Sequence, residues 1–165
     1  MPTFPEHLSA AVGSEPVIHR FVPADGGDDV QALVFAGFPE AGQVTGFTYG
    51  LATGRELALT VRTDDVEWGA VPARVAAALR GRHPFRPGQA IGYAGALVEG
   101  SPLTSLLLAE PIPAVRALVP HLGGVELVGV YPIHAAERDL TYATGFESLW
   151  DRPWDRLDPH REPVA

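Results

Sequence analysis

The sequence contains no cysteine and no lysine. Without cysteine there are no disulfides, no thiolate metal sites and no cysteine nucleophile. Because all 12 basic residues are arginine, Schiff-base and general-base lysine chemistry are excluded too. No apolar run approaches the roughly 18 residues of a membrane span, and the N-terminus lacks a basic segment followed by an apolar one. We therefore expect a cytoplasmic protein with no membrane contact and no plain export signal.

Positive charge is scarce as well. The 12 arginines are outnumbered by 20 acidic residues, which gives a formal net charge of −8. Such a chain is repelled by phosphates, so we expect no nucleic-acid partner and, among charged partners, a basic one. Apolar residues make up 46% of the 165 positions, which is typical of a globular chain with a real core. Proline and glycine are scattered and not gathered in a linker, so residues 1–165 are predicted to form a single domain.

Hydrophobic periodicity and turn signals predict a mixture of helices and strands. Helices are expected at residues 3–13, 72–81 and 135–149, and strands at residues 16–23, 30–38, 42–51, 55–62, 89–98, 103–109 and 125–133. Strict alternation across residues 55–62 indicates a half-buried strand. The acidic, glycine-rich residues 25–29 predict a hairpin turn. This order favours an α+β fold with a mixed, mainly antiparallel sheet and about three helices packed against it.

One pair of residues has a spacing suited to acid–base or metal chemistry. His134 and Glu137 stand three positions apart at the expected start of the last helix, where both side chains share one face. No second pair at helical spacing accompanies them, and Glu137 equally suits the positive end of the helix dipole, so we favour a structural role. The sequence also lacks a nucleophile elbow, a P-loop lysine and a complete EF-hand pattern. We predict no catalytic residue, no metal and no cofactor.

Acidic residues beside tryptophans indicate where a protein partner would bind. Trp68 follows Asp64, Asp65 and Glu67, and Trp154 lies among acidic residues near the end of the chain. Large aromatic side chains with a polar group often anchor interfaces, although they more often cover the core of a small domain. We predict binding contacts at Asp64, Asp65, Glu67, Trp68, Asp151, Trp154 and Asp155.

Several stretches, taken in order, resemble the suppressor of fused (SUFU) domain family. They begin with a glycine-containing segment at residues 47–51 that leads into an Arg-Glu-Leu strand at residues 55–59. The later stretches are Trp68 with the helix at 75–79, Pro-Phe-Arg-Pro-Gly at 84–88, Ser-Pro-Leu at 101–103 with residues 106–111, the strand and helix at 128–149, and Asp-Pro-His-Arg at 158–161. Together they place the resemblance over residues 28–162.

The resemblance implies a SUFU-like fold and a binding protein without catalytic residues. Animal members of the family hold a zinc-finger transcription factor of Hedgehog signalling, and many bacterial members look like immunity proteins that neutralise cognate toxins. The short single-domain form is similar to the bacterial kind. We therefore predict a non-enzymatic bacterial immunity protein that binds a basic toxin effector. The alternative is a small-molecule or metal-dependent enzyme, or a ligand-binding domain, with a pocket near His134, Glu137 and Arg138.

Overall fold

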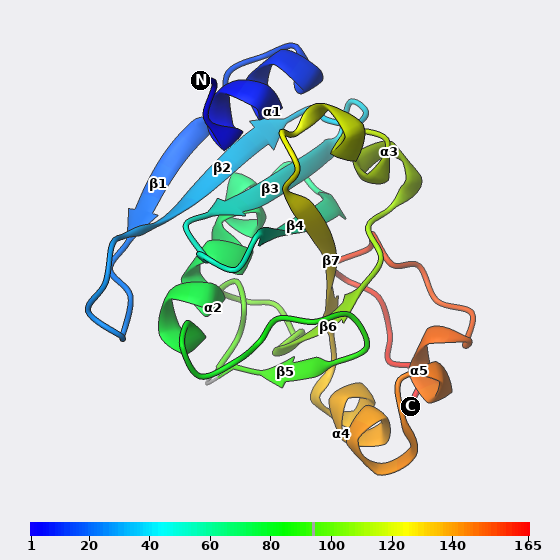
Figure 1. Cartoon of the computed structure of the whole chain (residues 1–165). Coiled ribbons are helices and arrows are strands. Elements are labelled where there is room, and N and C mark those ends of the chain that lie inside the picture. The colour runs from blue at the N-terminus through cyan, green and yellow to red at the C-terminus, as the bar shows by residue number, and fades with distance from the viewer. Residues whose placement is uncertain (94) are drawn as a thin grey trace.

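Seven strands form one sheet in the computed structural model, which describes residues 1–93 and 95–165 (Figure 1). The strands are β1 (Val17–Phe21), β2 (Val30–Ala36), β3 (Gln43–Tyr49), β4 (Arg55–Arg62), β5 (Ala90–Gly92), β6 (Ser105–Ala109) and β7 (Glu126–Ile133). Their order across the sheet is β1-β2-β3-β4-β7-β6-β5. Among the described strands only the β4–β7 pair is parallel, through residues 55–58 and 126–129, and the other pairs are antiparallel. The predicted α+β fold with a mixed, mainly antiparallel sheet is confirmed.

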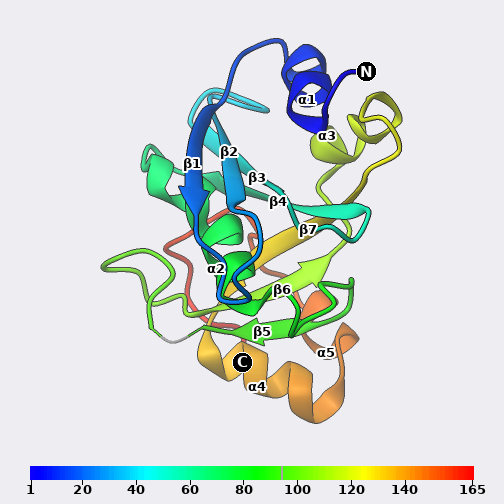
Figure 2. The same ribbon diagram turned by 60° about the vertical axis from the view of Figure 1, so that its left-hand side comes forward.

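Helices lie on both faces of this sheet (Figures 1 and 2). They are α1 (Phe4–Val12), α2 (Val71–Leu79), α3 (Pro113–Arg116), α4 (Ala135–Thr144) and α5 (Glu147–Trp150), with 3-10 turns η1 (Val66–Ala70) and η2 (Val119–His121). Val71 and Val75 of α2 belong to the core on one face, with Leu57 and Leu59 of β4. On the other face α1, α3 and η2 enclose a second core, and a third lies beneath α5. The sheet is therefore buried on both sides at its centre.

A contact between two glycines sets the path of the chain after β4. A side chain at Gly46 of β3 would place its Cβ 1.8 Å from the carbonyl oxygen of Gly69 in η1. A side chain at Gly69 would in turn place its Cβ 2.5 Å from Val34. Only glycine allows backbones to approach this closely. The contact holds η1, and the acidic loop that precedes it, tightly against the sheet.

The predicted elements are present, with differences that have local causes. The strand expected at residues 89–98 is limited to Ala90–Gly92, and Ala94 lies outside the described residues. The last helix ends at Gly145, where φ is +99°, and α5 follows as a separate turn. The short helix α3 was not predicted, because four residues show no helical periodicity, and α5 was expected as the last turn of the helix at 135–149 and not as a separate element. The strand at 55–62 is buried on both faces and not half-buried, since β4 is central in the sheet.

Candidate functional site

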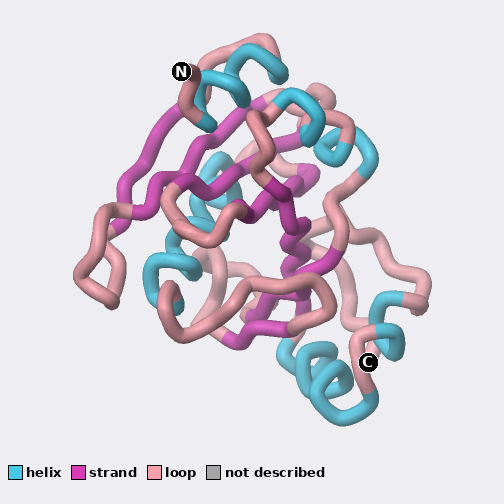
Figure 3. The backbone as a smooth tube through the Cα atoms, in the orientation of Figure 1, coloured by secondary structure: helices cyan, strands magenta, loops and turns pink. Residues whose placement is uncertain are grey.

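The C-terminal segment, residues 151–165, runs without helix or strand past the end of β4 (Figure 3). We call it the tail. β7 pairs with only the first half of β4, and the tail lies beside the second half. The backbone N–H of Arg62 donates to the carbonyl oxygen of Leu157 at 2.8 Å. The guanidinium of Arg62 also donates to Asp155 Oδ2 at 2.9 Å. Residues 93 positions apart in sequence are thereby brought together.

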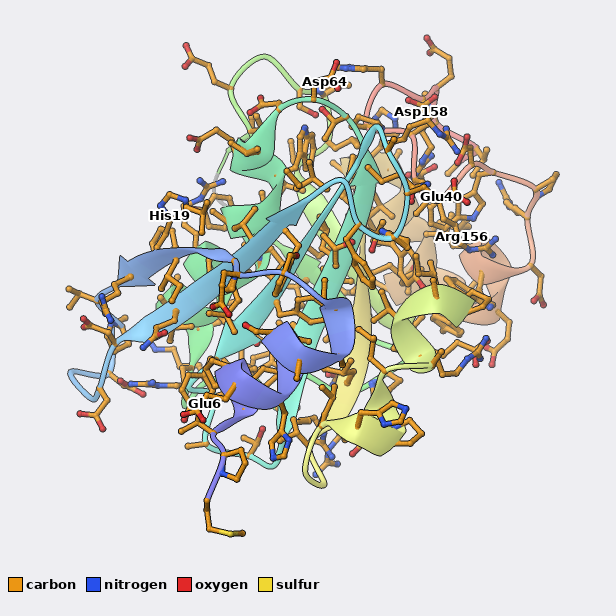
Figure 4. All side chains as sticks on the ribbon, turned by 90° about the horizontal axis from the view of Figure 1, so that it is seen from above. Glu6, His19, Glu40, Asp64, Arg156 and Asp158 are labelled. Atoms are coloured by element: carbon orange, nitrogen blue, oxygen red, sulfur yellow. The ribbon has the colours of Figure 1, made fainter. Side chains whose placement is uncertain are left out.

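Acidic side chains from three segments gather at this end of the sheet. Figure 4 labels Glu40 of the β2–β3 loop, Asp64 of the β4–η1 loop and Asp158 of the tail on the same side of the molecule. The hydrogen bond that Arg62 donates to Asp155, together with the charges of Asp155, Asp158 and Glu40, raises the pKa of Arg62 above its ordinary value. We call this surface the acidic end and define it by Glu40, Asp64, Asp65, Glu67, Asp155 and Asp158.

A groove adjoins the acidic end between η1 and the loop at residues 96–99. Asp65, Glu67 and Glu99 line it together with Arg74. The side chain of Arg74 donates to the carbonyl oxygen of Leu97, which ties the loop to α2. Asp65 accepts from the backbone N–H of Glu67 at 3.0 Å and so fixes the start of η1. The groove can receive a cationic side chain, because carboxylates stand on both of its sides.

The predicted contact residues do not all lie at this surface. Asp64, Asp65, Glu67 and Asp155 are exposed members of the acidic end. Trp68 is only 2% exposed and packs in the core with α2, so the prediction of a partner contact at this residue is wrong.

The other two predicted residues of the tail, Trp154 and Asp151, have contacts within the tail and α5. Trp154 is half-buried, donates from its indole N–H to the carbonyl oxygen of Leu149 at 3.0 Å, and stacks against Arg156 and Arg161. Asp151 is exposed at the end of α5, where its charge acts on Arg156. Trp154 therefore works mainly as packing for the tail.

His134 and Glu137 form part of an internal clamp. Glu137 is 0% exposed and accepts from both terminal nitrogens of Arg161, at 2.6 and 2.7 Å. It also accepts from the backbone N–H groups of His134 at 2.8 Å and Val164 at 2.9 Å. Burial raises the pKa of Glu137, but these bonds outweigh it and hold the pKa below its ordinary value. His134 Nε2 is also hydrogen-bonded to the carbonyl oxygen of Arg161 at 2.9 Å. We call the Glu137–Arg161 pair together with this bond the tail clamp.

The tail clamp bears on whether His134 and Glu137 form a metal or acid–base site, which the sequence left open. Both carboxylate oxygens of Glu137 already have donors, so this residue has no oxygen to offer a metal or a substrate. Arg138 is bonded to Asp139 and Ser105. Within residues 1–93 and 95–165 no group of three His, Cys, Asp or Glu residues could hold a metal ion. The structural role that we favoured for Glu137 is the one observed.

A second buried carboxyl group was missed from the sequence. Glu56 of β4 is 7% exposed and accepts from the Thr48 hydroxyl at 2.8 Å and from the Gly50 N–H at 3.2 Å. Burial raises the pKa of Glu56 to about 7. It adjoins a shallow depression that also contains Arg80 and Asp25, where paired hydrogen bonds from Arg80 lower the pKa of Asp25 to about 2. Alternation placed Glu56 on a solvent face, and no sequence signal showed that this face would be covered.

Fold and surface together define a small α+β domain with a mixed sheet, a clamped tail and an acidic end. Neither a family model nor a curated protein matches the sequence. Among solved structures, a SUFU homologue from Neisseria gonorrhoeae FA 1090 superposes with a TM-score of 0.75 and 20% identity, covering 96% of this chain and 93% of that one. The fold of this chain is therefore that of suppressor of fused proteins.

Two further structures have the same fold. A chain in the Sufu–Fu complex superposes with a TM-score of 0.65 and 12% identity, covering 96% of this chain and 89% of that chain. Suppressor of Fused from Drosophila gives 0.66 and 11% identity, and the match covers 98% of this chain and 50% of that one. The chain thus corresponds to about half of the Drosophila protein.

Among the described helices of this chain, none is both long and apolar enough to cross a membrane.

Proposed function

We propose that this chain is a non-enzymatic protein-binding domain, and specifically a bacterial immunity protein that neutralises a basic toxin by direct binding in the cytoplasm. The observation that carries the proposal is the acidic end, where carboxylates from three separate segments converge beside an acidic groove. A protein with the same fold has been solved as the Sufu–Fu complex, which supports binding of a protein partner.

The acidic end favours a partner whose working surface is basic. Its exposed carboxylates lie on short loops that are held against the sheet by the glycine contact and by the tail. Pre-positioned charges accelerate association by steering, and they lose little side-chain freedom on binding. Toxins that cleave nucleic acid carry basic surfaces for phosphate, and an acidic protein competes for such a surface. Neutralisation would follow from covering that surface without any chemical step.

Copurification with the proteins encoded beside its gene tests the proposal directly. The expected result is a basic partner whose association rate falls as salt is raised. A variant with Asp64→Asn, Asp65→Asn and Glu67→Gln should slow association by about tenfold. The matched control, Glu110→Gln with Glu147→Gln and Glu162→Gln, removes the same charge from exposed positions elsewhere and should leave the rate nearly unchanged. Recovery of no partner, or an association rate indifferent to salt, would contradict the proposal.

A further inference from the structure

One edge strand of the sheet is covered by a helix, and the other is open. At one edge, β5 is covered by α4, and the hydroxyl of Tyr142 donates to the carbonyl oxygen of Ala90 at 3.1 Å. At the other edge lies β1, and among the described residues β2 is the only strand paired with it (Figure 2). An edge strand directs every second N–H and C=O outward, where another strand can bind them. The edge at β1 therefore offers backbone hydrogen bonds to an added strand.

The side chains along this edge are apolar and exposed. Val17 is 62% exposed, Ile18 is 45% exposed and Val22, just beyond the strand, is 82% exposed. Natural edge strands are commonly protected by a lysine or another charge at such positions, and Val17 and Ile18 provide none. Pro16 and Pro23 bracket the segment. Because proline has no N–H to donate, they confine pairing to about six residues.

The two faces of β1 differ in what they would present to an added strand. Phe21 packs against the core beneath α2, so Val17, which shares its side of the strand, offers an apolar contact on that face. Ile18 points to the opposite face, where it lines a groove with Pro5 and Ala10 of α1. The rim of the same groove carries Glu6 and Glu15.

The acidic side chains at both ends of β1 favour a particular kind of added strand. Glu6 and Glu15 lie at the start of β1, and Asp28 and Asp29 lie in the turn at its end, with Arg20 between them. In an antiparallel pair of two copies, the acidic start of one strand would face the acidic turn of the other. This repulsion, added to a net charge of −8 on each copy, disfavours self-association. A strand with apolar residues at its centre and a cation at each end is complementary.

We propose that the β1 edge is a second binding site, which takes an extended segment of a partner protein as an added strand. The segment has apolar or β-branched residues against Val17 and Ile18, and arginine or lysine at both ends. One cation lies over the groove beside Glu6 and Glu15, with its aliphatic stem against the apolar floor. The other lies near the acidic turn. This site is separate from the acidic end and does not depend on the proposed function.

A synthetic peptide tests the site without knowledge of the partner. The probe is the fluorescein-labelled, C-terminally amidated heptapeptide Arg-Val-Thr-Thr-Val-Val-Arg, which places threonine opposite Arg20 in the antiparallel register. Alternate amide N–H groups of a strand point to opposite edges, so two further versions of the peptide are made. In one version the amides that point to one edge are N-methylated, and in the other version those that point to the opposite edge. Binding is followed by fluorescence anisotropy, and the contact surface by amide shifts and hydrogen exchange. The probe should bind and should protect outward-facing amides of β1, and only one methylated version should lose binding.

Side-chain variants locate the contact. Val17→Lys places a cation on the open edge and should weaken peptide binding by at least about tenfold, because like charges repel and an edge lysine blocks pairing. Ala143→Lys, an exposed change on α4 with the same added charge, should leave affinity unchanged. A peptide with glutamate at both ends should not bind. These results together would support an added strand at β1.

Other outcomes overturn the proposal. Equal affinity for both lysine variants, or shifts confined to the acidic end, would mean that the peptide binds by charge alone. No binding at about 1 mM peptide, which corresponds to roughly 4 kcal/mol, would refute the site. A concentration-dependent dimer with β1 amides protected in the absence of peptide would identify a second copy as the occupant instead. Each of these results leaves the test of the acidic end unaffected.

Discussion

The burial of Glu56 predicts how the stability of the protein depends on pH. Glu56 is 7% exposed and lies on β4, the central strand of the sheet. The hydroxyl of Thr48 and the N–H of Gly50 donate to it, but they do not replace the water that the charge loses. Loss of that water disfavours the ionised form, and burial therefore raises the pKa of Glu56 to about 7.

The direction of the effect follows from where the proton is held. In the unfolded chain this carboxyl group has a pKa near 4.5, whereas in the folded protein the pKa is about 7. Between these values the folded protein keeps a proton that the unfolded chain has released, so stability falls as pH rises from 4.5 to 7 and then becomes level. At about 1.4 kcal/mol for each pH unit, the loss amounts to about 3 kcal/mol.

Urea unfolding of wild type and Glu56→Gln at pH 5 and pH 8 measures this contribution. Glutamine keeps the shape and one acceptor without the charge, so the variant should lose about 2.5 kcal/mol less than wild type between pH 5 and pH 8. Glu126→Gln is the control, because that side chain is 63% exposed and should leave the pH dependence unchanged. Carboxyl groups common to all three proteins cancel in the comparison. If wild type and Glu56→Gln show the same change in stability, the assignment of a raised pKa is incorrect.

The remaining predictions concern the clamp, the glycine contact and the surface pair. Arg161→Ala leaves the buried charge of Glu137 unpaired and should lower the free energy of unfolding by about 3–5 kcal/mol in urea at pH 7, and an unchanged stability would show that the pair contributes little. Gly46→Ala should cost about 3 kcal/mol or more, seen as a fall in melting temperature, because its Cβ would overlap the Gly69 backbone. Asp155→Asn should leave the melting temperature almost unchanged, because its pair with Arg62 is exposed, yet it should slow association with a basic partner.

Local patterns predicted the long elements of the fold well. The three longer helices and all seven strands have sequence signals within their own residues, such as the proline at the start of α2 and the alternation in β4. The capping position of Glu137 was likewise foreseen from its spacing to His134. These features depend on residues a few positions apart, which is the range over which periodicity and capping operate.

Features that join distant parts of the chain could not be predicted in the same way. Arg161 lies 24 positions from Glu137, and no local rule pairs an arginine in a proline-rich tail with a carboxylate on a helix. Glu56 was placed on a solvent face because alternation cannot show that α1 and α3 cover that side of the sheet. Trp68 beside acidic residues resembled an interface anchor, but the approach of Gly69 to β3 draws it into the core. In each case tertiary packing decided the role of the residue.

The tail clamp links the stability of the domain to the form of its acidic end. Asp155 and Asp158 belong to a segment with no secondary structure of its own, which is held at one end by Arg62 and at the other by Arg161. The Arg62 pair is exposed and contributes little, whereas loss of Arg161 would leave the buried charge of Glu137 unpaired, so the tail depends on the clamp together with the packing of Trp154 and Val164 against the third core. A fixed tail presents its carboxylates with little further loss of entropy on binding. Arg161 donates to both carboxylate oxygens of Glu137, so Glu137 cannot bind a metal or a substrate. The same contact holds the tail in place, and the tail carries Asp155 and Asp158 of the surface that we propose for the partner.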